Sequence, residues 1–255
     1  KNPFKKHNHK IRTSKNEIDG IECTDHMIPV HAFQAWLCRC FGILLPFTRY
    51  RKIVKQIAYE AADYGGDGFS DIYGDFLYKD RFKQTLPLWK VNVPLIILPQ
   101  TIGPFKDEKN YNFAIKVLRL AKYIFVRDSK FENELNKLGL PYERTKDLSA
   151  FMKPKPWNID VTPNSIGINV SGLAYSNKFK GLEGQFEFYP ELINRLIEKI
   201  QVLGHSVYLI PHSYCYGKPE KNNDDIVACK LAYARLDNKD NVFLVDKDMI
   251  APEVK

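Results

Sequence analysis

The feature that most constrains the fold is an alternation of short apolar runs with helical patterns, which occurs twice along the chain. In the first occurrence, residues 93–98 (VPLIIL) and 123–126 (YIFV) have the length and composition of strands buried on both faces. Apolar residues recur at helical spacing over residues 113–121 between them. A strand, a helix and a strand in this order form a crossover between parallel strands. The sequence therefore predicts an α/β fold.

The second occurrence follows residues 152–164 (MKPKPWNIDVTPN), which contain three prolines and are expected to form a linker. Residues 165–170 (SIGINV) and 207–210 (VYLI) predict two further strands. Between them, an apolar stripe predicts a helix that ends at Gly204; its members are Leu192, Ile193, Leu196, Ile197, Ile200 and Leu203. We therefore expect two Rossmann-like lobes, residues 1–151 and 165–255, with ligands at the carboxyl ends of their strands.

The chain begins with Lys1 rather than Met and ends at Lys255, within the expected second lobe. A second sheet that stops after two strands would keep an open edge. We therefore expect the sequence to be part of a longer protein, with the second lobe truncated at its C-terminus.

The charge pattern and the cysteines exclude several classes of protein. The net charge is +8, and residues 1–15 contain six basic residues and no acid, which predicts a solvated basic tail. A tail of this kind could touch nucleic acid or an anionic membrane, but no aromatic residues alternate with it on a defined face, so no nucleic-acid partner is expected. Five cysteines without a CxxC pair fit neither a disulfide framework nor a zinc ribbon, and reduced thiols are expected in a cytoplasmic protein.

The longest apolar stretch, residues 32–47, is interrupted by Gln34 and Arg39 and is too short to span a membrane. Buried core is the favoured interpretation, and a monotopic membrane contact is the alternative. The first 55 residues otherwise show no pattern that places an element.

Two glycine- or proline-containing clusters could bind a ligand in the first lobe. In residues 65–74 (GGDGFSDIYG), Gly66 would let the backbone approach an anion, and Asp67 or Asp71 could orient a hydroxyl. Gln100 and Thr101, in residues 99–105 (PQTIGPF), have donor and acceptor groups suited to sugar or carboxylate contacts. The alternative for both clusters is a structural turn.

Arg127, Asp128 and Ser129 follow the second predicted strand. A guanidinium beside the N–H groups of a helix N-terminus would bind phosphate or carboxylate. The alternative is an ion pair between Arg127 and Asp128, with Ser129 only capping the helix. Ser129 and Glu132 have the spacing of a capping box, and Gly139 would end that helix.

The second lobe offers Asn169 and Ser171 after one strand and His212 after the next. His212 is the best candidate for a general acid or base, because histidine is the side chain that ordinarily titrates near neutrality. A hydrogen-bonded structural histidine is the alternative. No carboxylate pattern beside His26 or His31 resembles a metal site, so no metal is expected.

Taken together and in this order, the segments GGDGFSDIYG, IILPQTIGPF, IFVRDS, SIGINVSGL and YLIPHS resemble the polysaccharide pyruvyl transferase family. An Asn-Asp pair follows at Asn223 and Asp224, and residues 147–151 (DLSAF) are similar to an Asp-x-Ala-Phe segment of the family with one extra residue. The resemblance covers about residues 60–225.

The resemblance implies a GT-B-like pair of lobes that transfers the enolpyruvyl group of phosphoenolpyruvate to two hydroxyls of a sugar in surface or exopolysaccharide biosynthesis. It implies catalytic roles for Arg127, which would help to hold the donor, and His212, which would act in proton transfer or binding. The substrate-binding residues would be Gly66, Asp67, Asp71, Gln100, Thr101, Asn169 and Ser171. No cofactor is implied besides the donor, and a lipid-linked oligosaccharide acceptor would imply peripheral contact with the inner face of the membrane.

Two family features are not found in this sequence: a Gly-containing loop after a first strand, and an Arg-x-His segment beyond the region that here ends at Lys255. Either the protein is longer, which we favour, or the donor site is lost. The alternatives are a GT-B glycosyltransferase that uses a nucleotide-sugar and a catalytically inactive glycan-binding relative.

Overall fold

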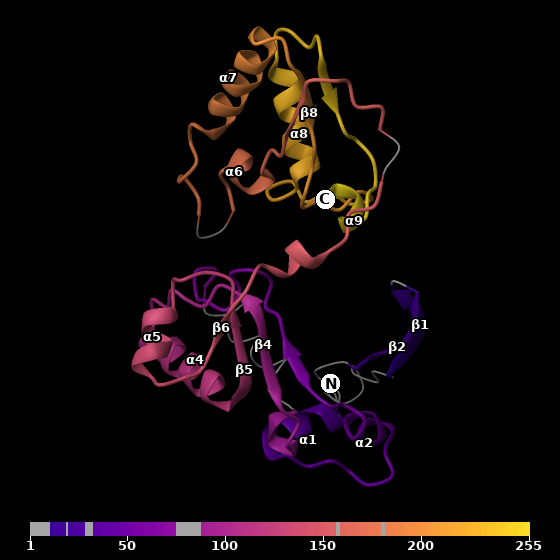
Figure 1. Ribbon diagram of the computed structural model, residues 1–255, viewed down its shortest axis with the longest axis vertical. Coiled ribbons are helices and arrows are strands. Elements are labelled where there is room, and N and C mark those ends of the chain that lie inside the picture. Colours follow the sequence, from indigo (N-terminus) through magenta and orange to yellow (C-terminus); the bar gives the residue numbers. More distant parts are fainter. Residues whose placement is uncertain (1–10, 19, 29–32, 75–87, 157–158, 180–181) are drawn as a thin grey trace, which may run out of the picture. The chain divides into compact units, whose positions relative to one another are not determined.

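A computed structural model describes residues 11–18, 20–28, 33–74, 88–156, 159–179 and 182–255 (Figure 1). The chain divides into two compact units, Lys1–Phe151 and Met152–Lys255. Each unit contains a parallel sheet with its own hydrophobic core, so the predicted α/β class is confirmed.

The first unit is built on a four-stranded parallel sheet in the order β3-β4-β5-β6. Its strands are β3 (Glu60–Ala62), β4 (Leu95–Gln100), β5 (Ala121–Val126) and β6 (Glu143–Arg144), and its helices are α4 (Glu108–Leu120) and α5 (Glu132–Lys137). Strand β4 buries Leu95 and Ile97 on one face, whereas Ile96 and Leu98 on the other face are half-buried, so the predicted burial on both faces is met only in part. Helix α4 turns Ala114, Val117 and Leu118 toward this core.

Helix α5 begins later than its sequence suggests. The predicted capping box is wrong: the helix starts at Glu132, and the residue before it, Phe131, makes no side-chain cap. Instead, the Asp128 carboxylate accepts a hydrogen bond from the backbone of Lys130 at 3.0 Å, so it stabilises a turn two residues ahead of the helix. Gly139, with φ 63°, ends the helix as expected.

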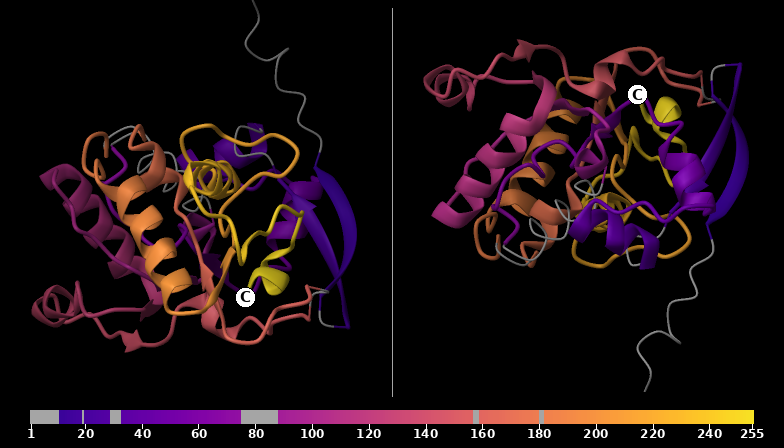
Figure 2. Two further views of the ribbon diagram at one scale, coloured as in Figure 1. Left: turned by 90° about the horizontal axis from the view of Figure 1, so that it is seen from above. Right: turned by 90° about the horizontal axis from the view of Figure 1, so that it is seen from below.

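The N-terminal region contains elements that the sequence did not predict. Strands β1 (Arg12–Ile18) and β2 (Ile21–Met27) pair as an antiparallel hairpin that is not hydrogen-bonded to the larger sheet (Figure 1, Figure 2). Residues 12–15, assigned to the basic tail, are therefore part of a strand, and residues 1–10 lie outside the described residues. The remaining elements are helices α1 (Phe33–Phe41) and α2 (Arg49–Val54), the 3₁₀ turn η2 (Trp89–Val91) and, after β6, the 3₁₀ turn η3 (Leu148–Phe151).

The second unit is built on a three-stranded parallel sheet in the order β7-β8-β9. The strands are β7 (Ser165–Ile168), β8 (Ser206–Leu209) and β9 (Val242–Leu244), and the helices are α6 (Gly172–Ser176), α7 (Tyr189–Val202), α8 (Asp225–Arg235) and α9 (Ala251–Val254).

The predicted apolar stripe of α7 is only half correct. Ile193, Ile197 and Ile200 are buried in the core, whereas Leu192 and Leu196 are exposed. Consecutive residues of a helix point about 100° apart. The pairs Leu192–Ile193 and Leu196–Ile197 therefore span a wider face than one sheet can cover, and the isoleucine of each pair is the one that is buried.

Among the residues that the structure describes, no helix is long and apolar enough to cross a membrane. All five cysteines are free thiols, and Cys38 and Cys229 are buried. Burial raises the pKa of the Cys229 thiol to about 12, which makes it an inert core residue.

Candidate active site

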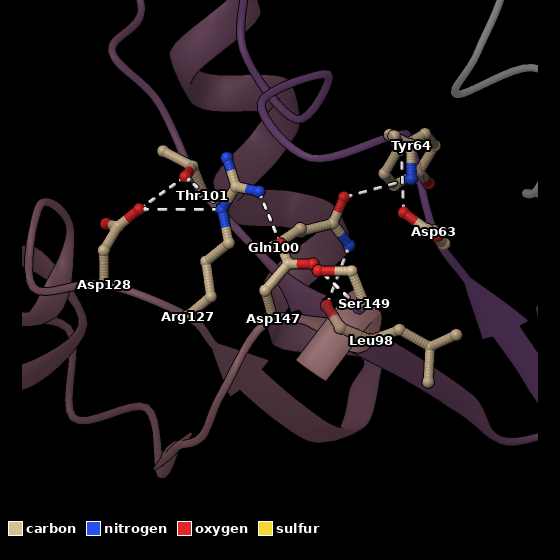
Figure 3. Close-up of polar contacts among 10 residues, drawn as sticks. Asp63, Tyr64, Leu98, Gln100, Thr101, Arg127, Asp128, Asp147 and Ser149 are labelled. Carbon is tan, nitrogen blue, oxygen red and sulfur yellow. Dashed lines mark hydrogen bonds and ion pairs between the residues drawn. The ribbon is translucent and has the colours of Figure 1, made fainter. Parts of the chain in front are cut away.

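The first unit places two predicted site residues, Thr101 and Gly66, beside the guanidinium of a third, Arg127; Figure 3 shows the contacts of Arg127 with Thr101 and Asp147. Arg127 directly follows β5, Thr101 follows β4, and Gly66 lies in the loop that follows β3. Asp147, which follows β6, completes the group. Because the strands are parallel, their carboxyl ends meet at one edge of the sheet, where α/β proteins bind ligands.

The Arg127 side chain is held from two sides. Its Nε donates to the Thr101 hydroxyl at 2.8 Å, and its Nη1 donates to a carboxylate oxygen of Asp147 at 2.6 Å. The Thr101 hydroxyl in turn donates to Asp128, whose carboxylate lies 4.0 Å from Nε of Arg127. The expected ion pair between Arg127 and Asp128 is therefore secondary, and Asp147 is the direct partner.

The pairing with Arg127 has an electrostatic consequence for Asp147. Hydrogen bonds from the Arg127 guanidinium, then from the Ser149 backbone, lower the pKa of Asp147 to about 2. The carboxylate is thus ionised across the physiological range and holds the guanidinium in one orientation. No hydrogen bond joins the Nη2 nitrogen of Arg127 to any described residue, whereas Nε and Nη1 are both engaged (Figure 3).

Gly66 lies directly against the guanidinium. A Cβ at this position would come within 3.2 Å of Nη1 of Arg127, and the φ angle of 68° also favours glycine. The Gly66 carbonyl accepts a hydrogen bond from the Thr101 backbone at 2.8 Å, which joins the loop after β3 to the end of β4. The backbone N–H groups of Gly66 and Asp67 have no hydrogen-bond partner among the described residues, so they remain available to an anion beside Nη2.

Two of the predicted substrate-binding residues, Gln100 and Asp71, form hydrogen bonds with other segments of the chain. Gln100 is fully buried: its Oε1 accepts from the Tyr64 backbone at 3.1 Å, and its Nε2 donates to the carbonyls of Ala62 and Leu98. Asp71 is also buried, and it accepts hydrogen bonds from the backbones of Lys106 and Asp107 and from Asn110.

These contacts give both residues positioning roles. Burial alone would raise the pKa of Asp71, but the hydrogen bonds from Asp107, Lys106 and Asn110 outweigh it and lower the pKa. Asp71 therefore fixes the start of α4 to the glycine-rich loop, and Gln100 fixes β3 to β4.

In the loop that follows β3, the carboxylate of Asp67 has one oxygen that can still accept a hydrogen bond from a ligand. Its Oδ2 accepts a hydrogen bond from the Tyr73 hydroxyl at 2.8 Å, and its backbone carbonyl accepts from Ser70. No described residue donates to Oδ1. Asp67 follows Gly66 directly, so a hydroxyl bound here would lie close to the Arg127 cluster.

The second unit forms its own cluster, at the carboxyl ends of β7 and β8. The Asp225 carboxylate is buried and accepts four hydrogen bonds: from Asn169 Nδ2 at 3.0 Å, and from the backbones of Gly172 at 2.7 Å, His212 at 3.0 Å and Ser213 at 2.8 Å. It thereby holds the loops of both strands together. The His212 ring is exposed, and no described residue hydrogen-bonds to it.

Ser171 has a local role in this cluster. It is the N-cap of α6, where its hydroxyl accepts from the Ala174 backbone, and its own backbone N–H donates to the Tyr189 hydroxyl at 3.1 Å. The structure thus joins Asn169 and the backbone of His212 through Asp225, whereas Ser171 bonds to Ala174 and Tyr189 instead.

Sequence reasoning missed Asp225 and named its neighbour Asp224 instead. Asp224 caps α8 by accepting from the Ile226 backbone, and it also accepts from the Cys215 backbone. A signal existed: two consecutive acids open a helix, where only one is required as a cap.

Among the described residues, no group of three or more His, Cys, Asp or Glu side chains is placed to hold a metal ion. The arrangement therefore offers two kinds of chemistry from the chain itself. The Arg127 cluster presents a preoriented cation with two free backbone donors, and the His212 cluster presents an exposed imidazole on a fixed loop.

A comparison with models of known families identifies the family of the chain. A family model described as polysaccharide pyruvyl transferase matches residues 8–254, nearly the whole chain. No solved structure matches the chain. The match includes every segment that builds the two clusters, and the chain belongs to the polysaccharide pyruvyl transferase family.

Proposed function

We propose that this transferase takes the enolpyruvyl group from phosphoenolpyruvate and places it on two hydroxyls of a saccharide. The observation that carries the proposal is the Arg127 cluster, with its free Nη2 beside the free N–H groups of Gly66 and Asp67. Phosphoenolpyruvate bears a phosphate and a carboxylate, and a guanidinium recognises either through two parallel hydrogen bonds.

The reaction has a simple balance. Two acceptor hydroxyls add to the central carbon of the donor, and the bond from that carbon to the phosphate oxygen breaks. Of the two hydroxyl protons, one converts the donor methylene to a methyl group, and the other leaves with the phosphate. The chemistry needs an anion seat and proton-transfer groups, and it needs no cofactor besides the donor.

We assign these requirements to named residues. Arg127 binds the donor anion, and Asp147 and Thr101 keep its guanidinium oriented. Asp67, through its available oxygen, accepts a hydrogen bond from an acceptor hydroxyl. His212 acts in proton transfer, and Asp225 positions it by accepting the backbone N–H groups of His212 and Ser213.

The proposal extends to the arrangement of the lobes and to the cellular location of the enzyme. We propose that residues 1–151 and 165–255 are the two Rossmann-like lobes of a GT-B-like enzyme, joined through residues 152–164. Five free thiols support a cytoplasmic enzyme, and a saccharide destined for the cell surface supports an acceptor presented on a lipid at the inner face of the membrane.

The test is a calorimetric titration of the protein with phosphoenolpyruvate and, in parallel, with common nucleotide-sugars. We expect saturable binding of phosphoenolpyruvate, and we expect Arg127→Ala to weaken it at least tenfold, since a charge-assisted pair contributes about 1.5–3 kcal/mol. Arg119→Ala, on the exposed face of α4, is the matched control and should bind as the parent does.

Each outcome decides between the functions considered. Binding of a nucleotide-sugar in place of phosphoenolpyruvate would identify a glycosyltransferase. Binding of a saccharide, with neither donor bound and no phosphate released from phosphoenolpyruvate, would identify a glycan-binding relative. If Arg127→Ala and Arg119→Ala weakened the binding of phosphoenolpyruvate equally, Arg127 would not be part of the donor site.

A further inference from the structure

The segment from α1 to α2 exposes large apolar side chains that contact one another. The rings of Phe33 and Trp36 are stacked, with 6.0 Å between their centroids, and the ring of Phe41 packs edge-on against that of Trp36, with 5.5 Å between their centroids. Ile43 and Phe47 continue the exposed apolar surface along the loop to α2, and Phe47 is 99% exposed. We call these five residues the aromatic surface.

The aromatic surface is additional to the face that α1 contributes to the protein core. Ala35 and Cys38, on the opposite side of the helix, are buried against Tyr50, Val54 and Val93. The helix therefore has two apolar faces, of which the core needs only one. A helix that is apolar beyond its core-facing stripe is typical of a second apolar environment.

The charge of the same segment identifies that environment. Residues 33–59 contain five basic residues and no Asp or Glu: Arg39, Arg49, Arg51, Lys52 and Lys55. Lys52 on α2 and Lys55, the C-cap of that helix, are exposed, and none of the five forms an ion pair with a described residue. Arg49 and Arg51 donate hydrogen bonds only to neutral oxygens, those of Ile11, Thr13 and Leu44, so their charges are not neutralised. Aromatic side chains bordered by cations without an acidic partner are the composition that binds an anionic lipid surface, where the rings enter the interface and the cations face the headgroups.

The backbone at Phe47 is consistent with this role. Its φ angle is 60°, a left-handed conformation that bulky residues rarely adopt. Glycine or asparagine would be relaxed at this position, whereas phenylalanine places a fully exposed phenyl ring there despite the backbone strain.

We propose that the aromatic surface and its five cations bind the protein peripherally to anionic lipid bilayers. Helix α1, the loop and α2 lie beyond the amino ends of β4 and β5, whereas Arg127 lies at their carboxyl ends (Figure 1). Membrane binding through this surface therefore leaves the Arg127 cluster uncovered. The proposal does not depend on the identity of the donor.

The test is co-sedimentation of the protein with phosphatidylcholine vesicles that contain either no or 30 mole per cent phosphatidylglycerol, a composition chosen on the order of that of anionic biological membranes. We expect binding to the anionic vesicles, weak binding to the neutral ones, and release at high salt. Equal binding to both kinds of vesicle, or to neither, would overturn the proposal.

Matched variants locate the surface. Since one basic residue contributes about a fivefold change in partitioning, Lys52→Ala/Lys55→Ala should weaken binding by about twenty-fivefold. Phe47→Ser should weaken it by about tenfold. The controls remove the same side chains elsewhere: Lys116→Ala/Lys199→Ala and Phe188→Ser, all exposed. If the control variants lost as much binding to anionic vesicles as the variants of the aromatic surface and its cations, the binding would not be specific to this surface.

Trp36 provides an independent readout of insertion. Vesicles with brominated acyl chains should quench the protein's tryptophan fluorescence, and Trp36→Phe should remove most of that quenching while it preserves an aromatic ring. Undiminished quenching in Trp36→Phe would exclude α1 from the membrane contact even if the protein sediments with the vesicles.

Discussion

At the scale of single residues, the buried polar side chains of this chain act mainly as connectors between segments. Asp71, Gln100 and Asp225 each make three or more hydrogen bonds, most of them to backbone groups of other segments, as burial of such groups requires. Glu60 is an exception. It is only 8% exposed, and its Oε2 has no hydrogen-bond partner among the described residues.

The isolation of Glu60 predicts a pH-dependent stability. Burial raises the pKa of Glu60 to about 8, so the folded protein keeps this carboxyl protonated at pH values where the unfolded chain ionises it. The stabilisation is complete below the unfolded pKa and is lost as the pH rises through the folded pKa. Between pH 5.5 and pH 8 we expect the free energy of unfolding to fall by about 3 kcal/mol from this residue.

The measurement is urea unfolding of the parent and of Glu60→Gln at both pH values. Glutamine cannot ionise, so the variant should lose this part of the pH dependence and gain relative stability at pH 8. Glu143→Gln, exposed on β6 of the same unit, is the control and should keep the parent slope. A Glu60→Gln variant with the parent slope would show that Glu60 is ionised in the folded state.

At the scale of elements, the site depends on how closely helices approach the ends of the strands. Helices α6 and α8 meet at their N-termini, where a Cβ on Gly172 would lie 2.4–2.6 Å from the backbone of Asp224. This approach allows the Gly172 N–H to reach the Asp225 carboxylate at 2.7 Å. Glycine is therefore required at this position by close packing, since its φ angle is not in the left-handed region.

We predict that Gly172→Ala will separate α6 from α8 and destabilise the second unit by about 2–3 kcal/mol, because backbone atoms cannot yield as a flexible side chain can. Chemical denaturation measures the loss of stability, and the turnover that we propose for His212 should fall with it. Gly217→Ala, with no atom within 4 Å of its added Cβ and no left-handed φ, is the matched control and should be neutral. A neutral Gly172→Ala would mean that the two helices are not packed this closely.

At the scale of the whole molecule, each of the two units has its own main hydrophobic core beside its sheet. Leu118 is fully buried in the core of the first unit, and Leu209 is fully buried in that of the second. Each core is closed by its own sheet and helices, so a defect in one need not reach the other.

Leu118→Ala and Leu209→Ala test this independence. Each should destabilise its own unit by about 3 kcal/mol through the cavity left behind. Hydrogen exchange followed by mass spectrometry should then show faster exchange for peptides of the altered unit and parent rates for the other. Acceleration of both units in either variant would indicate one cooperative fold.

Local patterns in the sequence determined the elements that carry the chemistry. The apolar runs that became β4, β5, β7 and β8 are recognisable because a buried strand needs continuous apolar residues, although β5 and β7 leave Tyr123 and Ile166 exposed on one face. The helical spacing before residue 121 predicted α4 for a similar reason. Since ligand-binding loops follow the strands of parallel sheets, the positions of Gly66, Thr101, Arg127, Asn169 and His212 could be predicted as well.

Only the tertiary structure decided which of these side chains are available for chemistry. The partner of Arg127 is Asp147, 20 positions along the chain, and Asn169 meets Asp225 across 56 positions. No local pattern encodes such pairs, because they depend on which strands lie side by side in the sheet. Gln100 and Asp71 were predicted from the sequence as ligand contacts. In the folded chain, their polar atoms form hydrogen bonds with the backbone of segments that are distant in the sequence, which no local pattern could indicate.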